Sequence, residues 1–284
     1  MQQPPPLTAA LDALLEGVPR KDLAAAAKAI SDGYRAGSPS HGIVTPLQAA
    51  AYAIARMPAT YAACVAVFAR LAEVMPDFAP RCLLDVGAGT GAASWAAAAA
   101  WPSLEIITML EPNPALRTLA RRLAEEGPLA KAEFLSAGLD AEKPQADLVV
   151  ASYVLAELPE DKAAATALDL WQGAETALAL IEPGTPQGFA RIRAARAALI
   201  EAGAHAAAPC THDNACPMQE GDWCHFSQRL ARSRDHMRLK DARVPFEDER
   251  YSYVVVTREK VASGARILAR PLETKPGLTF KLCD

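Results

Sequence analysis

The segment L-L-D-V-G-A-G-T-G at residues 83–91 constrains the fold of this chain more than any other. Residues 82–86 are apolar apart from Asp85, as in a short buried strand, and an alanine-rich helical segment follows the glycines. Glycine adopts backbone angles that other residues avoid and lets the main chain approach a ligand closely. A strand, a glycine turn and a helix in this order predict the first unit of an α/β fold.

The segments that follow continue the alternation of strand and helix. Further strands are expected at 106–110, 132–135, 147–152 and 176–181, with helices at 114–126 and 188–202. Residues 203–248 break this alternation, and apolar strands resume at 251–256 and 278–282. The prediction is a Rossmann-like parallel sheet with a cysteine-rich insertion before its sixth strand.

Four regions follow from this pattern. We expect an N-terminal helical region at 1–78, the Rossmann-like core at 79–202, a cysteine-rich, basic insertion at 203–248 and C-terminal strands that complete the sheet at 249–284.

An acidic residue and two polar residues follow later strands of this core. Glu111 ends the second strand, 20 positions beyond Gly91, where a carboxylate can accept hydrogen bonds from ribose hydroxyls. Ser152 and Tyr153 end the fourth strand, and side chains at the carboxyl edge of such a sheet face the ligand crevice. The alternatives at this point are a nicotinamide dinucleotide site and a tight turn without a ligand.

Four cysteines form a second candidate site. Cys210, Cys216 and Cys224 are spaced C-x5-C-x7-C, and Cys283 follows after 58 intervening residues. Six cysteines in 284 residues are too few for a disulfide framework, which favours a metal or an iron–sulfur cluster. Zinc held by the first three thiolates and either His212 or His225 is equally compatible with these spacings.

The other two cysteines fit a different role. Cys64 lies in an apolar helical segment and Cys82 opens a buried strand, so both are expected to be core thiols.

A basic segment follows the cysteines in a chain of net charge -4. Residues 228–243 contain six Arg or Lys against two Asp, and Trp223 and Phe226 precede them. The guanidinium group of arginine can donate two parallel hydrogen bonds to a phosphate, and aromatic rings can stack on unpaired bases. These residues therefore predict RNA contact. The alternative is a helix face exposed to solvent. The candidate RNA-binding residues are Arg229, Arg232, Arg234, Arg238 and Lys240.

The N-terminal sequence carries no basic residue before Arg20, unlike a secretory signal or a transit peptide. The longest apolar stretch, 92–101, is too short to cross a bilayer. We therefore expect a cytoplasmic bacterial protein with no membrane partner.

The glycine turn resembles motif I of the class I S-adenosylmethionine-dependent methyltransferases, because its form is D-V-G-A-G-T-G-A. That resemblance implies that Glu111 binds the ribose. It also implies that the turn lines the cofactor through Asp85, Gly87, Ala88, Gly89, Thr90 and Gly91. The fourth strand lacks the N-P-P-Y and P-C motifs of some methyltransferases, so the sequence identifies no catalytic residue and no acceptor.

Several segments together resemble one family, the methyltransferase-like assembly factors of the mitochondrial small ribosomal subunit and their bacterial relatives. They are A-Y-A-I-A-R-M-P-A-T-Y at 51–61, S-Y-V-L-A-E-L at 152–158, E-P-G-T-P-Q-G-F at 182–189, C-P-M at 216–218, W-C-H-F-S-Q-R at 223–229 and E-D-E-R-Y-S-Y at 247–253. Members of this family usually continue past the last cysteine, whereas this sequence ends at Asp284.

The resemblance implies a [4Fe–4S] cluster on Cys210, Cys216, Cys224 and Cys283. It also implies contact with small-subunit ribosomal RNA or a pre-ribosomal particle. The sequence as a whole leaves three functions open. They are an rRNA methyltransferase, a non-catalytic assembly factor, and a zinc-stabilised methyltransferase of a small molecule or protein.

Overall fold

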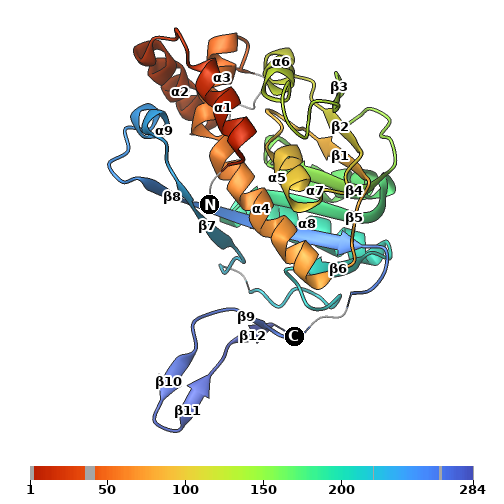
Figure 1. Cartoon of the computed structure of the whole chain (residues 1–284). Helices are drawn as coiled ribbons and strands as arrows, with labels where there is room; N and C mark the ends of the chain where they lie inside the picture. Colours follow the sequence, from red (N-terminus) through yellow and green to blue (C-terminus); the bar gives the residue numbers. More distant parts are fainter. Residues whose placement is uncertain (1–2, 36–41, 220, 262–263, 284) are drawn as a thin grey trace.

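The computed structural model describes residues 3–35, 42–219, 221–261 and 264–283 (Figure 1). A central sheet has the strand order β3-β2-β1-β4-β5-β8-β6, and β7 pairs with the first six residues of β8, 246–251. Strands β1 to β5 are parallel, whereas β8 runs antiparallel to β5, β6 and β7. The strands of this sheet are β1 (Cys82–Val86), β2 (Ile106–Leu110), β3 (Glu133–Leu135), β4 (Ala146–Ser152), β5 (Ala174–Pro183), β6 (His205–Ala208), β7 (Phe226–Ala231) and β8 (Phe246–Thr257).

Helices cover both faces of the sheet (Figure 1). One face carries α1 (Pro5–Leu14), α2 (Arg20–Arg35), α3 (Pro46–Ala55), α4 (Met57–Val74), α5 (Ala92–Ala100) and α6 (Pro114–Leu123). The other face carries η2 (Leu155–Glu157), η3 (Glu160–Lys162), α7 (Ala163–Gln172) and α8 (Pro186–Glu201). The short helix α9 (Arg234–Leu239) lies between β7 and β8.

Alternation along each strand builds two separate cores. Leu83 packs with the helices of the first face and Leu84 with those of the second, and Ala179 and Leu180 of β5 divide in the same way. Because successive side chains of a strand point to opposite faces, a sheet covered on both sides needs continuous apolar strands, as this sequence has. The parallel-dominated α/β fold with its helical N-terminal region and its insertion before β8 is confirmed.

Helix α4 requires a correction to the sequence analysis. By length and composition it could cross a membrane, since its 18 residues are long and apolar enough, and 50% of them are buried inside the protein. It contacts α5, β6, β7 and β8, which is the packing of a core helix.

The C-terminal segment also differs from the prediction. Residues 278–282 do not join the central sheet, and β6 occupies its edge instead. The segment forms two small antiparallel pairs, β10 (Leu272–Thr274) with β11 (Gly277–Thr279) and β9 (Arg266–Ile267) with β12 (Leu282–Cys283). The physical reason is that its apolar side chains alternate with exposed polar ones, whereas three of the four residues of β6 are alanines that are buried beside β8.

Candidate functional site

The glycine turn connects β1 to α5 at the carboxyl edge of the sheet. Gly87, Gly89 and Gly91 have φ angles of 68°, 57° and 84°, in the left-handed region that favours glycine. A Cβ at Gly87 would lie 2.5 Å from Val154 Cγ2, whereas a Cβ at Gly89 would meet no atom within 4 Å. The turn is therefore closed beneath Gly87 and open above Gly89.

Glu111 lies directly against this turn. Its Oε2 accepts a hydrogen bond from Gly89 N at 2.8 Å and its Oε1 accepts one from Asn113 N at 2.8 Å. Burial raises the pKa of Glu111, and the two backbone donors oppose that rise. A carboxylate has about four acceptor positions, so Glu111 can hold the turn and still accept bonds from two ligand hydroxyls.

Asp85 is buried beneath the turn. Its Oδ2 accepts hydrogen bonds from Ser94 N at 3.1 Å and Ser94 Oγ at 2.7 Å, which anchors the first turn of α5. Its Oδ1 is buried without a partner among the described residues. Burial raises the pKa of Asp85 to about 6. Ala88 and Thr90 are buried as well, so Gly89 is the residue of the turn with open space above it.

Ser152 is the last residue of β4 and Tyr153 follows it, and both are half-buried. The Ser152 side chain lies near the thiol of Cys64 in α4. Tyr153 has a φ of 62°, and its hydroxyl donates to Glu249 Oε1 of β8 at 2.7 Å. Both side chains were expected to line the cofactor crevice, and the Tyr153 hydroxyl already has a partner on another element.

Arg56 completes a cluster with Tyr153 and Glu249. Its Nη2 lies 3.5 Å from Glu249 Oε1, and its guanidinium lies 6.0 Å from the centre of the Tyr153 ring. The three residues come from three segments that the sequence analysis quoted, and it gave Arg56 and Glu249 no role. No spacing in the sequence connects them, and only the positive φ of Tyr153, visible in the structure, marks the position as unusual.

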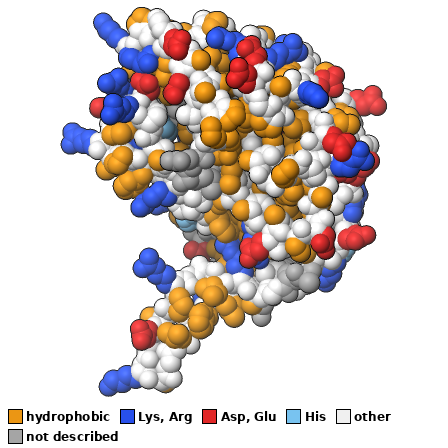
Figure 2. Space-filling model, in the orientation of Figure 1, with side chains coloured by type: hydrophobic (Ala, Val, Ile, Leu, Met, Phe, Trp, Pro, Cys, Tyr) orange, Lys and Arg blue, Asp and Glu red, His pale blue; other side chains and the backbone are white. Residues whose placement is uncertain are grey.

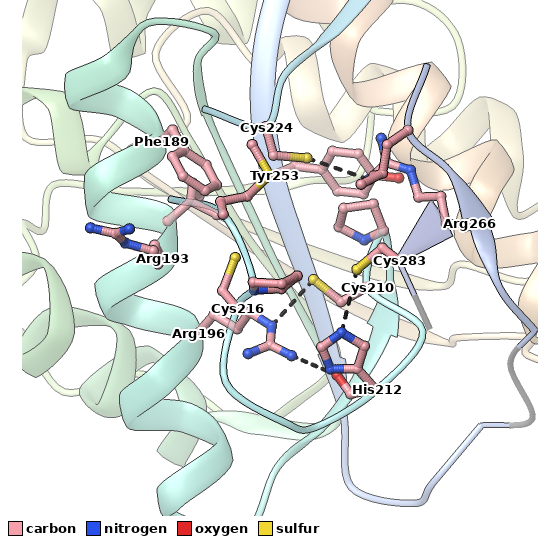
Figure 3. A pocket seen from close by; sticks show the side chains of 15 residues that line it. Phe189, Arg193, Arg196, Cys210, His212, Cys216, Cys224, Tyr253, Arg266 and Cys283 are labelled. Atoms are coloured by element: carbon pink, nitrogen blue, oxygen red, sulfur yellow. Dashed lines mark hydrogen bonds between the residues drawn. The ribbon is translucent and has the colours of Figure 1, made fainter. Parts of the chain in front are cut away.

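The four cysteines of the predicted metal site line one cavity of about 40 Å³ (Figure 3). Cys210, Cys216 and Cys224 lie on the segment between β6 and β7, and Cys283 lies on β12. The structure thus brings together thiols that are as many as 73 positions apart. Cys64 is buried in α4 as expected, and Cys82 is half-buried at the start of β1, away from this cavity.

Arginines rather than carboxylates surround these thiols. Arg196 Nε of α8, a side chain that is only 4% exposed, donates to Cys210 Sγ at 3.2 Å. Arg266 Nη1 of β9 donates to Cys224 Sγ at 3.4 Å, and Arg193 also lines the cavity. No Asp or Glu occurs among the described lining residues. The sequence analysis missed these arginines, because they lie outside the cysteine segment.

Burial and the arginines act on the thiols in opposite directions. Burial raises the pKa of Cys210, and the Arg196 guanidinium opposes that rise. Burial likewise raises the pKa of Cys283, as does the nearby Cys216 thiol, while Arg266 opposes both. The cavity is an apolar enclosure whose fixed positive charge favours anionic sulfur.

The two candidate histidine ligands lie differently. His212 Nε2 is 3.3 Å from Cys283 Sγ, and its Nδ1 is buried without a partner in the described part of the chain. His225 stacks on Trp223 and does not line the cavity. Within residues 3–35, 42–219, 221–261 and 264–283, no group of three or more His, Cys, Asp or Glu side chains is placed to hold a metal ion.

The basic residues gather on the hairpin of β7, α9 and β8. Arg229 pairs with Asp248 through two bonds of 2.7 Å. Arg232 and Lys240 both pair with Glu247, at 3.2 Å and 2.7 Å. Two carboxylates of β8 thus pair with these three cations and offset most of their charge.

The remaining two candidates are more open. Arg234 is exposed, and the exposed Arg238 lies 3.8 Å from Asp235. The predicted stacking rings are engaged: Phe226 packs on Tyr251, Tyr253 and Arg266, and Trp223 Nε1 donates to Gly184 O at 3.1 Å. The RNA-facing positive charge of the hairpin is therefore smaller than its sequence predicts.

Comparison with known proteins identifies the family. The family model described as "Mitochondrial small ribosomal subunit Rsm22" matches residues 46–284. The chain belongs to the Rsm22 family. The resemblance to the methyltransferase-like assembly factors of the mitochondrial small ribosomal subunit is confirmed by this match.

Curated relatives agree with this assignment. The human protein "Ribosome assembly protein METTL17, mitochondrial" is 31% identical over 195 residues, which cover 62% of this Rsm22-family chain and 42% of the relative. "Rsm22-cox11 tandem protein 2, mitochondrial" of Schizosaccharomyces pombe is 28% identical over 250 residues, 76% of this chain and 32% of the relative. The chain thus spans less than half the length of these relatives. Their names and the family description are mitochondrial, which makes our expectation of a cytoplasmic bacterial protein wrong.

Solved structures with a similar fold include two methyltransferases. Magnesium protoporphyrin IX methyltransferase of Synechocystis PCC 6803 has a TM-score of 0.46 at 17% identity, covering 71% of this chain and 80% of its own. Precorrin-6y C5,15-methyltransferase of Geobacter metallireducens GS-15 has a TM-score of 0.44 at 15% identity, covering 68% of this chain and 86% of its own.

Proposed function

We propose that this protein is an assembly factor of the small ribosomal subunit that holds S-adenosylmethionine at the glycine turn and a [4Fe–4S] cluster in the cysteine cavity. The observation that carries the proposal is the convergence of four distant thiols on one cavity without a carboxylate, with Arg196 and Arg266 donating to two of them. The cluster would be structural, because four protein thiolates leave no iron free for a substrate.

The composition of the cavity fits such a cluster. Four thiolates give the liganded cluster a net negative charge, which Arg196 and Arg266 would balance. Cys210, Cys216, Cys224 and Cys283 would each bind one iron and would together connect the loop before β7 to β12.

Zinc fits this cavity less well. A single ion needs its ligands gathered around one point at about 2.0–2.3 Å. The described residues contain no such group, and His225 lies elsewhere. Four cysteines lining one cavity, with arginines bonded to two of them, favour the cluster.

The glycine turn supports a nucleoside cofactor. Open space above Gly89 and the carboxylate of Glu111 at the same edge suit a ligand with ribose hydroxyls. Bound S-adenosylmethionine would supply an electrophilic methyl group. Glu111 would orient the ribose and Gly89 would let the ligand approach the main chain.

Family membership supports the ribosomal partner. The names of the relatives describe ribosome assembly and a mitochondrial location for those proteins, and the same role and location are part of our proposal here. Ribosomal RNA contact would use Arg234 and Arg238, the exposed candidates of the basic hairpin.

Methyl transfer is the second candidate function, favoured by the glycine turn and Glu111. Tyr153 weighs against it, because its hydroxyl already bonds to Glu249 at the edge where an acceptor would enter. A transfer assay with labelled S-adenosylmethionine and purified small-subunit particles separates the two. An assembly factor leaves the particles unlabelled, whereas stoichiometric labelling would identify an enzyme.

Sedimentation tests the proposal as a whole. Anaerobically purified protein is mixed with small-subunit particles of the organism that encodes it and run on a density gradient. Co-sedimentation of the wild type, and its loss in Cys210→Ser, is the expected result. A wild type that stays at the top of the gradient would contradict the proposed function.

A further inference from the structure

An arm at residues 266–283 projects from the body of the protein, built from β9, β10, β11 and β12 (Figure 1). Figure 2 shows hydrophobic side chains gathered along it. The large apolar side chains of the arm are exposed to 53% at Ile267, 65% at Leu272, 59% at Leu278, 44% at Phe280 and 46% at Leu282. They form more than half of the exposed large hydrophobic side chains that the structure describes.

The strand pairing within the arm is too short to stabilise the arm by itself. Strands β10 and β11 pair over three residues each, and a two-stranded hairpin without a covered face is at best marginally stable in water. Soluble proteins rarely expose such apolar rows unless the surface is an interface. The arm therefore needs a partner that covers Leu272 and Leu278.

Its charge indicates the kind of partner. The exposed residues 267–282 include Arg270, Lys275 and Lys281 but only one acid, Glu273. No ion pair of these three cations occurs within the described residues. A complementary surface is apolar at its centre and carries carboxylates at its rim.

A protein fits this chemistry better than RNA. RNA recognition uses aromatic rings and arginine planes that stack on bases, and Phe280 is the arm's single aromatic residue. Aliphatic side chains such as Leu272 and Leu278 gain instead from burial in an apolar groove.

We propose that the arm docks into an apolar groove, rimmed by carboxylates, on a protein of the small ribosomal subunit. This inference rests on the proposed function for the identity of the particle. The arm begins at Arg266, which donates to Cys224, and ends at Cys283, so both of its ends are held at the cysteine cavity. The cluster proposed for the cysteine cavity would therefore fix the direction in which the arm points.

The test compares two variants for binding to purified small-subunit particles. Leu272→Ser combined with Leu278→Ser removes two apolar side chains of the arm. Val44→Ser is the control, because Val44 is 71% exposed and lies far from the arm in the sequence. Both changes lie on exposed positions, and equal melting temperatures confirm that folding is unaffected. We expect the double variant to bind about tenfold more weakly or worse, and Val44→Ser to bind like the wild type.

Photo-crosslinking identifies the partner. With benzoyl-phenylalanine in place of Leu272, we expect crosslinks to a ribosomal protein. Crosslinks to RNA alone, or a self-association that the double variant abolishes in light scattering, would overturn the proposal.

The outcomes also separate the two proposals. Wild-type protein that fails to bind particles contradicts the proposed function. Wild-type binding that the double variant retains in full contradicts the arm proposal and leaves the proposed function standing.

Discussion

The hydroxyl of Tyr153 and the carboxylate of Glu249 are 2.7 Å apart, which ties the end of β4 to β8. Tyr153 holds a φ of 62° there, and its N–H donates to Ile181 O at 2.7 Å. The next residue, Val154, lies directly under Gly87 of the glycine turn. The pair thus connects the basic hairpin to the floor of the cofactor turn.

Removing this hydrogen bond tests the connection. Tyr153→Phe keeps the ring and is expected to lower the free energy of unfolding by about 1–2 kcal/mol, because buried Glu249 loses a donor. Urea denaturation measures the loss. Tyr251→Phe is the matched control, since the Tyr251 hydroxyl has no hydrogen bond among the described residues, and equal losses in both variants would contradict the role of the pair.

Alanine at Gly89 separates ligand binding from backbone strain. Gly89→Ala places a Cβ in the open space above the turn, and we expect at least about tenfold weaker S-adenosylmethionine binding by calorimetry. Gly17→Ala is the control, because Gly17 also has a positive φ, 72°, with no atom within 4 Å. Both variants should lose about 1 kcal/mol of stability. Equal affinities would show that the ligand does not use this turn.

Glu182 gives a pH dependence of stability. This buried side chain caps η2 through Leu155 N at 2.8 Å, and burial raises its pKa to about 8. Since the folded state retains a proton that the unfolded chain loses near its ordinary pKa of 4.5, stability falls as the pH rises from there to about 8. Glu182→Gln is expected to be more stable than the wild type at pH 8, by a few kcal/mol, and to flatten this dependence.

Thermal unfolding across this pH range measures the effect. Glu175→Gln changes an exposed residue of the same strand and should leave the pH profile unchanged. A wild-type profile that Glu182→Gln does not alter would show that the carboxyl group of Glu182 is not protonated in the fold.

Serine substitutions test whether the four cysteines act together. Cys216→Ser is expected to lower stability by more than about 2 kcal/mol in anaerobically purified protein, because a group bound only by the folded state stabilises it. Cys82→Ser, outside the cavity, should cost less than about 1 kcal/mol. Equal, small losses in the two variants would argue that the cavity holds no bound group.

Local patterns predicted much of this structure. The strand, glycine turn and helix around Gly89 follow from residues that are neighbours in the sequence, and the cysteine spacing marked a site whose four thiols do line one cavity. These features depend on short-range geometry and on chemistry that few residue types provide.

Long-range pairing could not be predicted in the same way. Arg56, Tyr153 and Glu249 meet only because α3 and β4 end, and the antiparallel β8 begins, near one edge of the sheet. The hairpin register sets Arg229 opposite Asp248, so a segment that is basic in sequence is partly neutral in space. The exposed arm was mistaken for a sheet strand because its apolar alternation is the same in either setting.

The iron and acid-labile sulfide content of anaerobically purified protein is the most direct test of the proposed cluster in the cysteine cavity. We predict about four iron and about four sulfide atoms per chain, both lost in Cys283→Ser. One zinc per chain, or no metal in protein that folds and binds small-subunit particles normally, would contradict a cluster in the cysteine cavity.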